Sequence, residues 1–76
     1  MDRILNILKN IRPEEDFTSS QDFISDGLLD SFDLISLVTD LDSFFSISID
    51  GMDIKQENFK NLDAIKNLLI KNGVQI

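Results

Sequence analysis

The fold of this chain is decided by the stretch Gly27-Leu28-Leu29-Asp30-Ser31-Phe32-Asp33-Leu34-Ile35-Ser36-Leu37-Val38. Asp30 is a favourable N-cap residue, and Asp33 places a second carboxylate in the first turn of the helix that follows. Apolar residues recur at helical intervals on one side, at Leu34, Val38, Leu41 and Phe45. Polar residues occupy the other side, at Asp33, Ser36, Asp40 and Ser43. This pattern predicts an amphipathic helix over residues 31–45, with Ser31 in its first turn.

Two aromatic residues of this helix, Phe32 and Phe44, do not lie on the apolar stripe. We expect them to be wedged at the edges of the stripe. The alternative is that they are partly exposed contact residues.

Upstream of this helix, residues 2–11 have the pattern of a short amphipathic helix that Pro13 ends. Residues 13–30 form a long connection, and a connection of this length in a compact domain is usually functional or disordered. Its isolated apolar residues favour a loop that is pinned across the core, through Phe17, Phe23, Ile24 and Leu28. Asp26-Gly27 is a turn signal.

Downstream, residues 46–49 alternate like a strand but are too short to form a sheet, so we predict an extended link that anchors Ile47 and Ile49. A short helix is predicted at about residues 53–58, with Ile54 directed inward, and Phe59 is predicted to be buried in the core. The last helix is predicted over residues 62–72. It would be capped by Asn61, carry an apolar stripe of Leu62, Ile65 and Leu69, and be followed by a loose tail at residues 74–76.

These elements predict an all-α fold for a single domain over residues 1–76. It consists of three main helices, one short helix and a long loop between the first and second helices. A chain of 76 residues has a thin core, so nearly every apolar stripe is needed for folding.

The composition excludes several function classes. The chain has no cysteine and no histidine, which removes thiolate metal sites, the commonest metal ligand and the commonest general base. A serine nucleophile needs a base within reach, so a self-sufficient enzyme is disfavoured and no catalytic residue is assigned. The acidic residues do not have the spacing of a calcium-binding loop, and no metal site is predicted.

The net charge is 7 − 14 = −7, which argues against nucleic acid and anionic membranes as partners. No basic residue occurs between Glu14 and Asp53, the interval that holds most of the acidic residues. This interval is either a solvated acidic surface or a docking face around Ser31, and charge alone does not decide between them. The chain has no apolar run long enough to span a membrane and no secretory signal pattern, so a cytoplasmic monomer is expected.

Ser31 is the residue that is most easily given a chemical role. A serine in the first turn of a helix has an exposed hydroxyl beside unpaired backbone N–H groups, where a phosphate ester would be stabilised. The alternative is that Ser31 only helps to cap the helix. An Asp-Ser pair by itself favours that alternative.

Three blocks of the sequence together resemble the acyl carrier proteins, whose Asp-Ser-Leu motif carries a 4′-phosphopantetheine arm. The blocks are Asp30-Ser31-Phe32 with the following Ile35, Leu37, Val38 and Leu41, then Phe45-Ser46-Ile47-Ser48-Ile49, then Glu57-Asn58-Phe59-Lys60-Asn61-Leu62-Asp63-Ala64-Ile65. The spacing between blocks and the chain length also fit a free-standing carrier. The chain departs from the common pattern at Leu28, where many members have glycine, and at Phe32, where leucine is usual. The form Leu28-Leu29-Asp30-Ser31 is similar to carriers of specialised pathways, including the D-alanyl carriers.

The resemblance implies that Ser31 holds a covalent 4′-phosphopantetheine arm that a phosphopantetheinyl transferase supplies from coenzyme A. It implies an acyl carrier for fatty acid, polyketide or specialised metabolite synthesis, with an aminoacyl (for example D-alanyl) or peptidyl carrier as the alternative. The other partners would be an activating ligase and acyl-transferring or synthase enzymes with basic docking patches. The docking residues would be Asp30, Phe32, Asp33, Ser36 and Asp40. An acyl chain would be lined by Val38, Leu41, Phe45 and Ile65, residues whose ordinary interpretation is core packing. A hypothesis from another class is a small acidic helical adaptor without a covalent arm.

Overall fold

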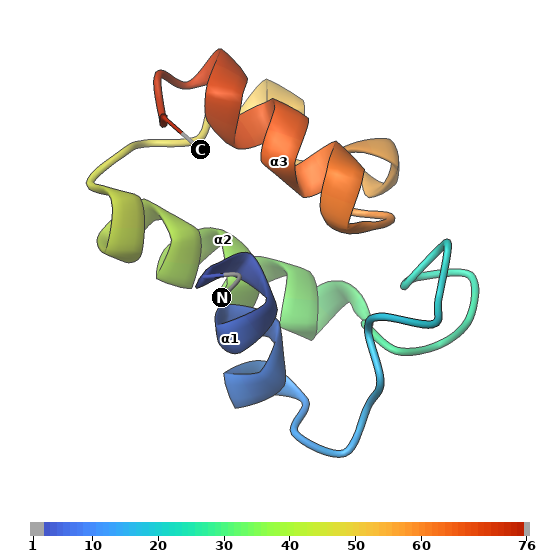
Figure 1. The fold of residues 1–76 in the computed structure, drawn as a ribbon. Helices are drawn as coiled ribbons and strands as arrows, with labels where there is room; N and C mark the ends of the chain where they lie inside the picture. Colours follow the sequence, from blue (N-terminus) through green and yellow to red (C-terminus); the bar gives the residue numbers. More distant parts are fainter. Residues whose placement is uncertain (1–2, 76) are drawn as a thin grey trace.

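The computed structural model describes residues 3–75 and contains three α-helices. They are α1 (Arg3–Ile11), α2 (Ser31–Phe45) and α3 (Leu62–Lys71), and two single-turn 3-10 helices, η1 (Gly51–Asp53) and η2 (Gln56–Asn58), lie between α2 and α3. The described residues contain no strand, and the predicted all-α fold with a long loop between α1 and α2 is confirmed (Figure 1). The bounds of α2 are those predicted; α3 is one residue shorter, and Asp2 lies outside the described residues.

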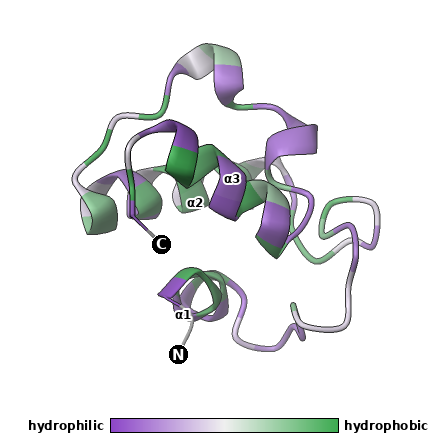
Figure 2. Ribbon diagram, turned by 45° about the horizontal axis from the view of Figure 1, so that its top comes forward, coloured by the Kyte–Doolittle hydropathy of each residue, from purple (hydrophilic) through white to green (hydrophobic). Residues whose placement is uncertain are grey.

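The core is formed by apolar side chains from all three helices. Its fully buried helical residues are Leu8 of α1, Leu37 and Leu41 of α2, and Ile65 and Leu69 of α3. Each helix carries both hydrophobic and hydrophilic residues (Figure 2), and α1 packs against both α2 and α3. Burying one such side chain contributes about 1.5–3 kcal/mol, so packing rather than helix propensity holds these short helices.

The buried face of α2 is wider than the predicted single stripe. Leu37, Val38 and Leu41 are buried, whereas Leu34 and Phe45 are only partly buried. The side chains of α1 and α3 belong to the same core cluster, so α2 must bury adjacent positions such as Leu37 and Val38. The predicted stripe passed from Leu34 to Val38 and left out Leu37, although Leu37 lies three residues after Leu34 and four before Leu41.

The connection over residues 12–30 is pinned to the core, as predicted. Phe17 and Phe23 are fully buried and meet edge to face, with ring centroids 5.0 Å apart. Leu29 is also buried, which the sequence analysis did not identify, while Ile24 and Leu28 are partly buried against the cluster. These anchors give the loop a fixed path to the start of α2.

The last part of this loop is a compact turn at residues 22–27. The Asp22 carboxylate accepts hydrogen bonds from the backbone N–H groups of Ile24 and Ser25. Gly27 has φ = +79°, a left-handed conformation that glycine adopts at no steric cost. The N–H groups of Leu28 and Leu29 then both donate to the Phe23 carbonyl, which directs the chain into Asp30.

The same loop is joined to the segment before α3. The Phe23 N–H donates to the Lys60 carbonyl at 2.6 Å, and Asn61 Nδ2 donates to the Gln21 carbonyl at 3.2 Å. Asn61 also caps α3 as predicted, because its Oδ1 accepts the Ala64 N–H at 2.8 Å. One side chain therefore links the loop to the start of the last helix.

The link after α2 follows the prediction for residues 46–49. Ile49 is buried and Ile47 is partly buried. The Asp42 carbonyl accepts the Ile47 N–H, and the Asp42 carboxylate accepts the Ile49 N–H at 3.0 Å. This carboxylate therefore holds the extended link against α2.

The predicted helix at residues 53–58 is replaced by the two separate turns η1 and η2. Ile54 lies between them with φ −82° and ψ 81°, which interrupts any continuous helix. Its side chain is 38% exposed, so the predicted inward orientation is wrong. Phe59 directly after η2 is fully buried, as predicted.

The chain after α3 is less loose than predicted. Gly73 has φ = +89°, and the Val74 N–H donates to the Leu69 carbonyl at 3.0 Å. This closure folds Val74 back, and its side chain is partly buried against the core. Gln75 is exposed, and Ile76 lies outside the described residues.

No helix within residues 3–75 combines the length and the apolar character that crossing a membrane requires.

Candidate functional site

The first turn of α2 is built by two aspartates that cap each other's backbone. Asp30 has an extended backbone, with φ −111° and ψ −172°, and its Oδ1 accepts the Asp33 N–H at 2.9 Å. Asp33 Oδ2 in turn accepts the Asp30 N–H at 3.0 Å. This reciprocal arrangement is a capping box, with aspartate in the position where glutamate is more usual. The prediction of Asp30 as the N-cap is confirmed.

Ser31 is the first residue of α2, and its side chain is exposed. Its hydroxyl takes part in none of the hydrogen bonds made between the described residues. Because Asp30 and Asp33 provide the caps, the alternative interpretation of Ser31 as a cap is not supported. The Ser31 and Phe32 N–H groups likewise make no hydrogen bond within residues 3–75, so they are available to an anion at the helix start.

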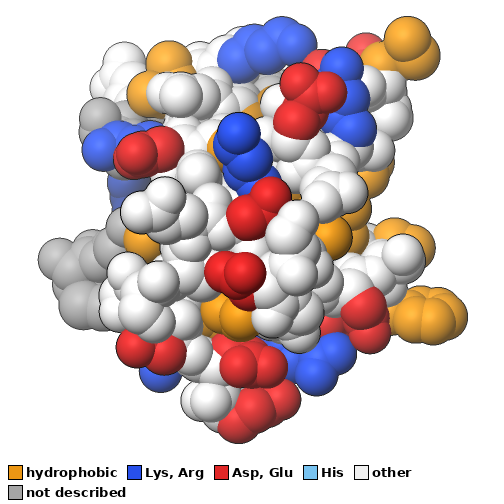
Figure 3. All heavy atoms as spheres, turned by 90° about the vertical axis from the view of Figure 1, so that its right-hand side faces the viewer, with side chains coloured by type: hydrophobic (Ala, Val, Ile, Leu, Met, Phe, Trp, Pro, Cys, Tyr) orange, Lys and Arg blue, Asp and Glu red, His pale blue; other side chains and the backbone are white. Residues whose placement is uncertain are grey.

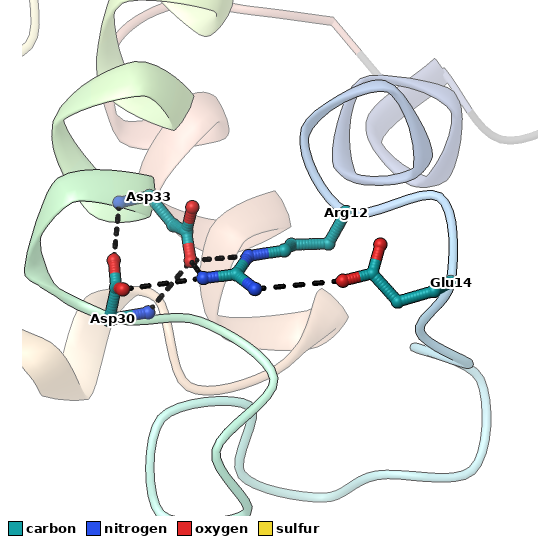
Figure 4. A network of polar contacts seen from close by, with 4 residues as sticks. All are labelled: Arg12, Glu14, Asp30 and Asp33. Atoms are coloured by element: carbon teal, nitrogen blue, oxygen red, sulfur yellow. Dashed lines mark hydrogen bonds and ion pairs between the residues drawn. The ribbon is translucent and has the colours of Figure 1, made fainter.

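Arg12 joins this turn from the end of α1 (Figure 4). Its Nε donates to Asp33 Oδ2 at 2.8 Å, and its Nη2 lies 2.7 Å from the same oxygen and 3.3 Å from Asp30 Oδ2. Its Nη1 lies 3.6 Å from Glu14 Oε2. This contact was not predicted from the sequence. The one signal was a lone basic residue just before the acidic interval, and the spacing of 18 and 21 residues to its partners could not be read from the chain.

The charges of this network shift the pKa values of two groups. Partial burial would raise the pKa of the Asp33 carboxyl, but hydrogen bonds from Arg12 and from the Asp30 N–H outweigh it and hold that pKa below its usual value. The hydrogen bond to Asp33, together with its negative charge, raises the pKa of Arg12. Asp33 is therefore ionised and Arg12 charged at neutral pH.

The predicted docking residues do not all present free side chains. Asp30, Phe32, Ser36 and Asp40 are exposed, but the Asp33 side chain is only 14% exposed and faces Arg12. Figure 3 shows the side of the molecule that carries the loop, where acidic side chains extend from the centre to the lower edge and hydrophobic side chains stand out beside them. The segment from Asp30 to Asp40 likewise exposes both kinds of group, since Phe32 and Ile35 are exposed as well as these two aspartates.

The exposed apolar residues include the two phenylalanines that the sequence placed off the stripe. Phe32 is 82% exposed, so the expectation that it is wedged at the stripe edge is wrong. Phe32 directly follows Ser31 in the first turn, where the rest of the described chain covers little of its ring. Phe44 is 54% exposed and contacts the Phe45 ring edge to face at 5.0 Å. Ile35, one turn after Phe32, is also exposed.

The four predicted acyl-lining residues belong to the packed interior or its margin. Val38, Leu41 and Ile65 are buried in the core cluster, and Phe45 is partly buried against it. The Arg3 guanidinium lies 5.2 Å from the centre of the Phe45 ring, in a cation–π contact. This packing matches the ordinary core interpretation of these residues.

Within residues 3–75, no cluster of three or more His, Cys, Asp or Glu side chains has a geometry that could hold a metal ion. In comparisons with known proteins, no family profile, no curated protein and no solved structure matches this chain. The interpretation of the site therefore depends on the sequence motifs and on the geometry of the first turn of α2.

Proposed function

We propose that this chain is a discrete carrier protein, modified at Ser31 with a 4′-phosphopantetheine arm and without catalytic activity of its own. One observation carries the proposal: Ser31 is exposed, and its hydroxyl makes no hydrogen bond with a described residue, in a helical turn that Asp30 and Asp33 already cap. A serine with a capping role would be engaged in those bonds. A serine that accepts a group from another enzyme must be accessible and free.

The modification is a phosphoryl-group transfer from coenzyme A. The Ser31 oxygen attacks the phosphorus that bears the pantetheine, a new P–O bond forms, and the pyrophosphate bond to 3′,5′-ADP breaks. The transferase supplies Mg²⁺ and the base that takes the hydroxyl proton, because the chain has no histidine and its described lysines and arginines lie outside the first turn. The arm brings the thiol that this cysteine-free chain lacks.

The residues around Ser31 fit a bound phosphodiester. The free N–H groups of Ser31 and Phe32 lie at the positive end of α2. Asp30 and Asp33 would repel the phosphodiester, but Arg12 lies within 3.3 Å of both carboxylates and offsets part of their charge. A negative group is therefore tolerated beside an acidic capping box.

The cargo is an acyl group held as a thioester, with an aminoacyl or peptidyl group as the alternative. The docking face of α2 combines the carboxylates of Asp30 and Asp40 with Phe32 and Ser36, and the remaining carboxylate, Asp33, acts through its bond to Arg12. Partner enzymes with basic patches would be steered to this face, since such charges mainly govern encounter rate and specificity.

Intact-mass analysis tests the proposal. The purified chain is incubated with coenzyme A, Mg²⁺ and a broad-specificity phosphopantetheinyl transferase, and we expect the mass of one phosphopantetheine group to be added. Ser31→Ala should abolish the addition, whereas Ser43→Ala, a matched exposed serine on the same helix and outside the docking face, should not.

A wild-type chain that gains no mass, or an adduct that persists in Ser31→Ala, would overturn the proposal. The first result would leave the adaptor without a covalent arm as the better hypothesis. Once the arm is attached, parallel loading reactions with fatty acyl and aminoacyl donors distinguish the two kinds of cargo.

A further inference from the structure

We propose that Arg12 is a positioning residue for the modification of Ser31, which it keeps presented by fixing the first turn of α2. This inference depends on the proposed function. Arg12 touches neither the hydroxyl nor any reacting atom; it acts through the Asp30 and Asp33 carboxylates.

The first step is the anchoring of Arg12 itself. It follows α1 directly, and its N–H donates to the Leu8 carbonyl at 2.9 Å, so its backbone continues the last turn of that helix. Ile4, Ile7 and Leu8 bury α1 in the core. The backbone that carries the guanidinium is therefore anchored to α1, which is itself packed in the core.

The second step is the convergence of hydrogen bonds on one oxygen. Asp33 Oδ2 accepts from Arg12 Nε at 2.8 Å and from the Asp30 N–H at 3.0 Å, and Arg12 Nη2 lies 2.7 Å away. The Arg12 fork thus fixes the rotamer of Asp33 in which it can also cap the Asp30 backbone. Ser31 is the next residue after that backbone, so its direction depends on the same bonds.

The third step is electrostatic. The Asp30, Asp33 and Glu14 carboxylates all lie within 4 Å of the Arg12 guanidinium, and no other cation is paired with them among the described residues. Without Arg12, Asp30 and Asp33 would face each other across the turn without compensation. The capping box would then lose one partner and gain a repulsion, so the first turn would open more often.

Lysine cannot replace this arrangement fully. Its ammonium is a single point charge, whereas the planar guanidinium presents several donors in a fixed fork. Arg12→Lys should therefore restore the charge but only part of the geometry. Comparison of the wild type with Arg12→Lys measures the effect of the guanidinium shape, and comparison of Arg12→Lys with Arg12→Gln measures the effect of the charge.

The test uses the whole chain with Arg12→Gln, Arg12→Lys and the control Lys9→Gln. Lys9 is exposed near the same end of α1, so its replacement changes the charge equally without touching the capping box. Circular dichroism first establishes that each variant is folded at the assay temperature. Amide hydrogen exchange and transferase kinetics are then measured on the same samples.

In Arg12→Gln we expect the Asp33 amide to exchange faster by on the order of tenfold, because its protection depends on the capping box. The amides of α3 should be unchanged. The KM of the transferase for the chain should rise by the factor by which the closed fraction of the first turn falls, while kcat stays the same, because only closed molecules bind productively. For Arg12→Lys, both the exchange rate of the Asp33 amide and the KM should lie between the values of the wild type and Arg12→Gln. For Lys9→Gln, both should equal the wild-type values.

The outcomes separate this proposal from the proposed function. If the wild type is not modified at all, the proposed function fails, and faster exchange at Asp33 then makes Arg12 a structural residue only. If the wild type is modified and Arg12→Gln retains the wild-type KM, or if Lys9→Gln raises the KM equally, the positioning role is overturned. Faster exchange across the whole of α3 would also contradict it, because the effect would then be global destabilisation.

Discussion

At the scale of single residues, Asp33 determines the character of the site. It caps Asp30 and pairs with Arg12 through the same oxygen, Oδ2, and its carboxyl group is ionised at neutral pH. Ser31 between the two aspartates is left without a structural duty. Ser31 can therefore remain exposed, because the two aspartates provide the caps of this turn.

The lowered pKa of Asp33 predicts a pH dependence of stability. A carboxyl whose pKa is lower in the folded state stabilises the fold above its unfolded pKa of about 3.9, and this contribution is lost as the pH falls through the folded value. The free energy of unfolding should therefore decrease below about pH 4. Asp33→Asn cannot titrate and should show a smaller decrease.

Urea unfolding at a series of pH values between neutral and acidic measures this effect. The pKa values of Asp16 and Asp22 are also lowered by hydrogen bonds from nearby Thr18 and Ser25, so some decrease should remain in the variant. An NMR titration that gives Asp33 an ordinary carboxyl pKa would contradict the argument.

Residue-scale prediction from sequence succeeded where the partner was close along the chain. Asp30 and Asn61 were recognised as caps because an N-cap bonds to a backbone group only three residues away. Arg12 was missed because its partners lie in the next helix. Phe32 was predicted to pack at the edge of the apolar stripe, but it is exposed. Helical periodicity gives the direction in which a side chain leaves the helix, but not whether another element packs on that side.

At the scale of elements, the turn at residues 22–27 places the start of α2. Gly27 has φ = +79°, and no heavy atom lies within 4 Å of the position that a Cβ would occupy. A side chain at this position would therefore meet no clash, but the backbone conformation would be strained. Gly51 also has open space around its Cβ position but no positive φ.

These two glycines make a matched pair of variants. Gly27→Ala should lower the free energy of unfolding by roughly 1 kcal/mol, because alanine is strained in the left-handed region. Gly51→Ala should be neutral or stabilising by up to about 1 kcal/mol, through the reduced freedom of the unfolded chain. Denaturant unfolding of both variants checks this. Equal destabilisation by both would show that the backbone angle at Gly27 is not the cause.

Elements were predicted correctly where the apolar pattern continues over many residues. The 15 residues of α2 were bounded correctly from a cap and a repeating pattern. Residues 53–58 are too few for periodicity to distinguish one helical turn from two 3-10 turns. Leu37 was left out although it shares the helical spacing of Leu34 and Leu41, because a line of single positions is narrower than the face that α2 buries with Leu37, Val38 and Leu41.

At the scale of the whole molecule, a small core supports a surface that carries exposed aromatic residues. Phe59 is fully buried whereas Phe32 is 82% exposed, so the same side chain serves packing in one place and lies in solvent in the other. A domain of this size has a stability of only about 5–10 kcal/mol. The two positions should therefore respond very differently to truncation.

Phe59→Ala should cost about 3–5 kcal/mol of unfolding free energy, a large share of the total. Phe32→Ala should change it by less than about 0.5 kcal/mol, because no packing is lost. Under the proposed function, Phe32→Ala should nevertheless slow loading by partner enzymes. Thermal unfolding and a loading assay on both variants measure this, and a strongly destabilised Phe32→Ala would contradict the exposed position.

Two hydrogen bonds join the loop before α2 to the segment before α3, from the Phe23 N–H to the Lys60 carbonyl and from Asn61 to the Gln21 carbonyl. They can form only after the later segment has been synthesised. A ribosome makes Ser31 well before it makes Lys60 and Asn61. Until then, the loop that leads into Ser31 lacks its fixed edge, and the core lacks the buried residues of α3. A nascent chain therefore contains Ser31 before the loop that leads to it is fixed. Under the proposed function, a transferase that recognises the folded turn would act only after the last helix has been synthesised.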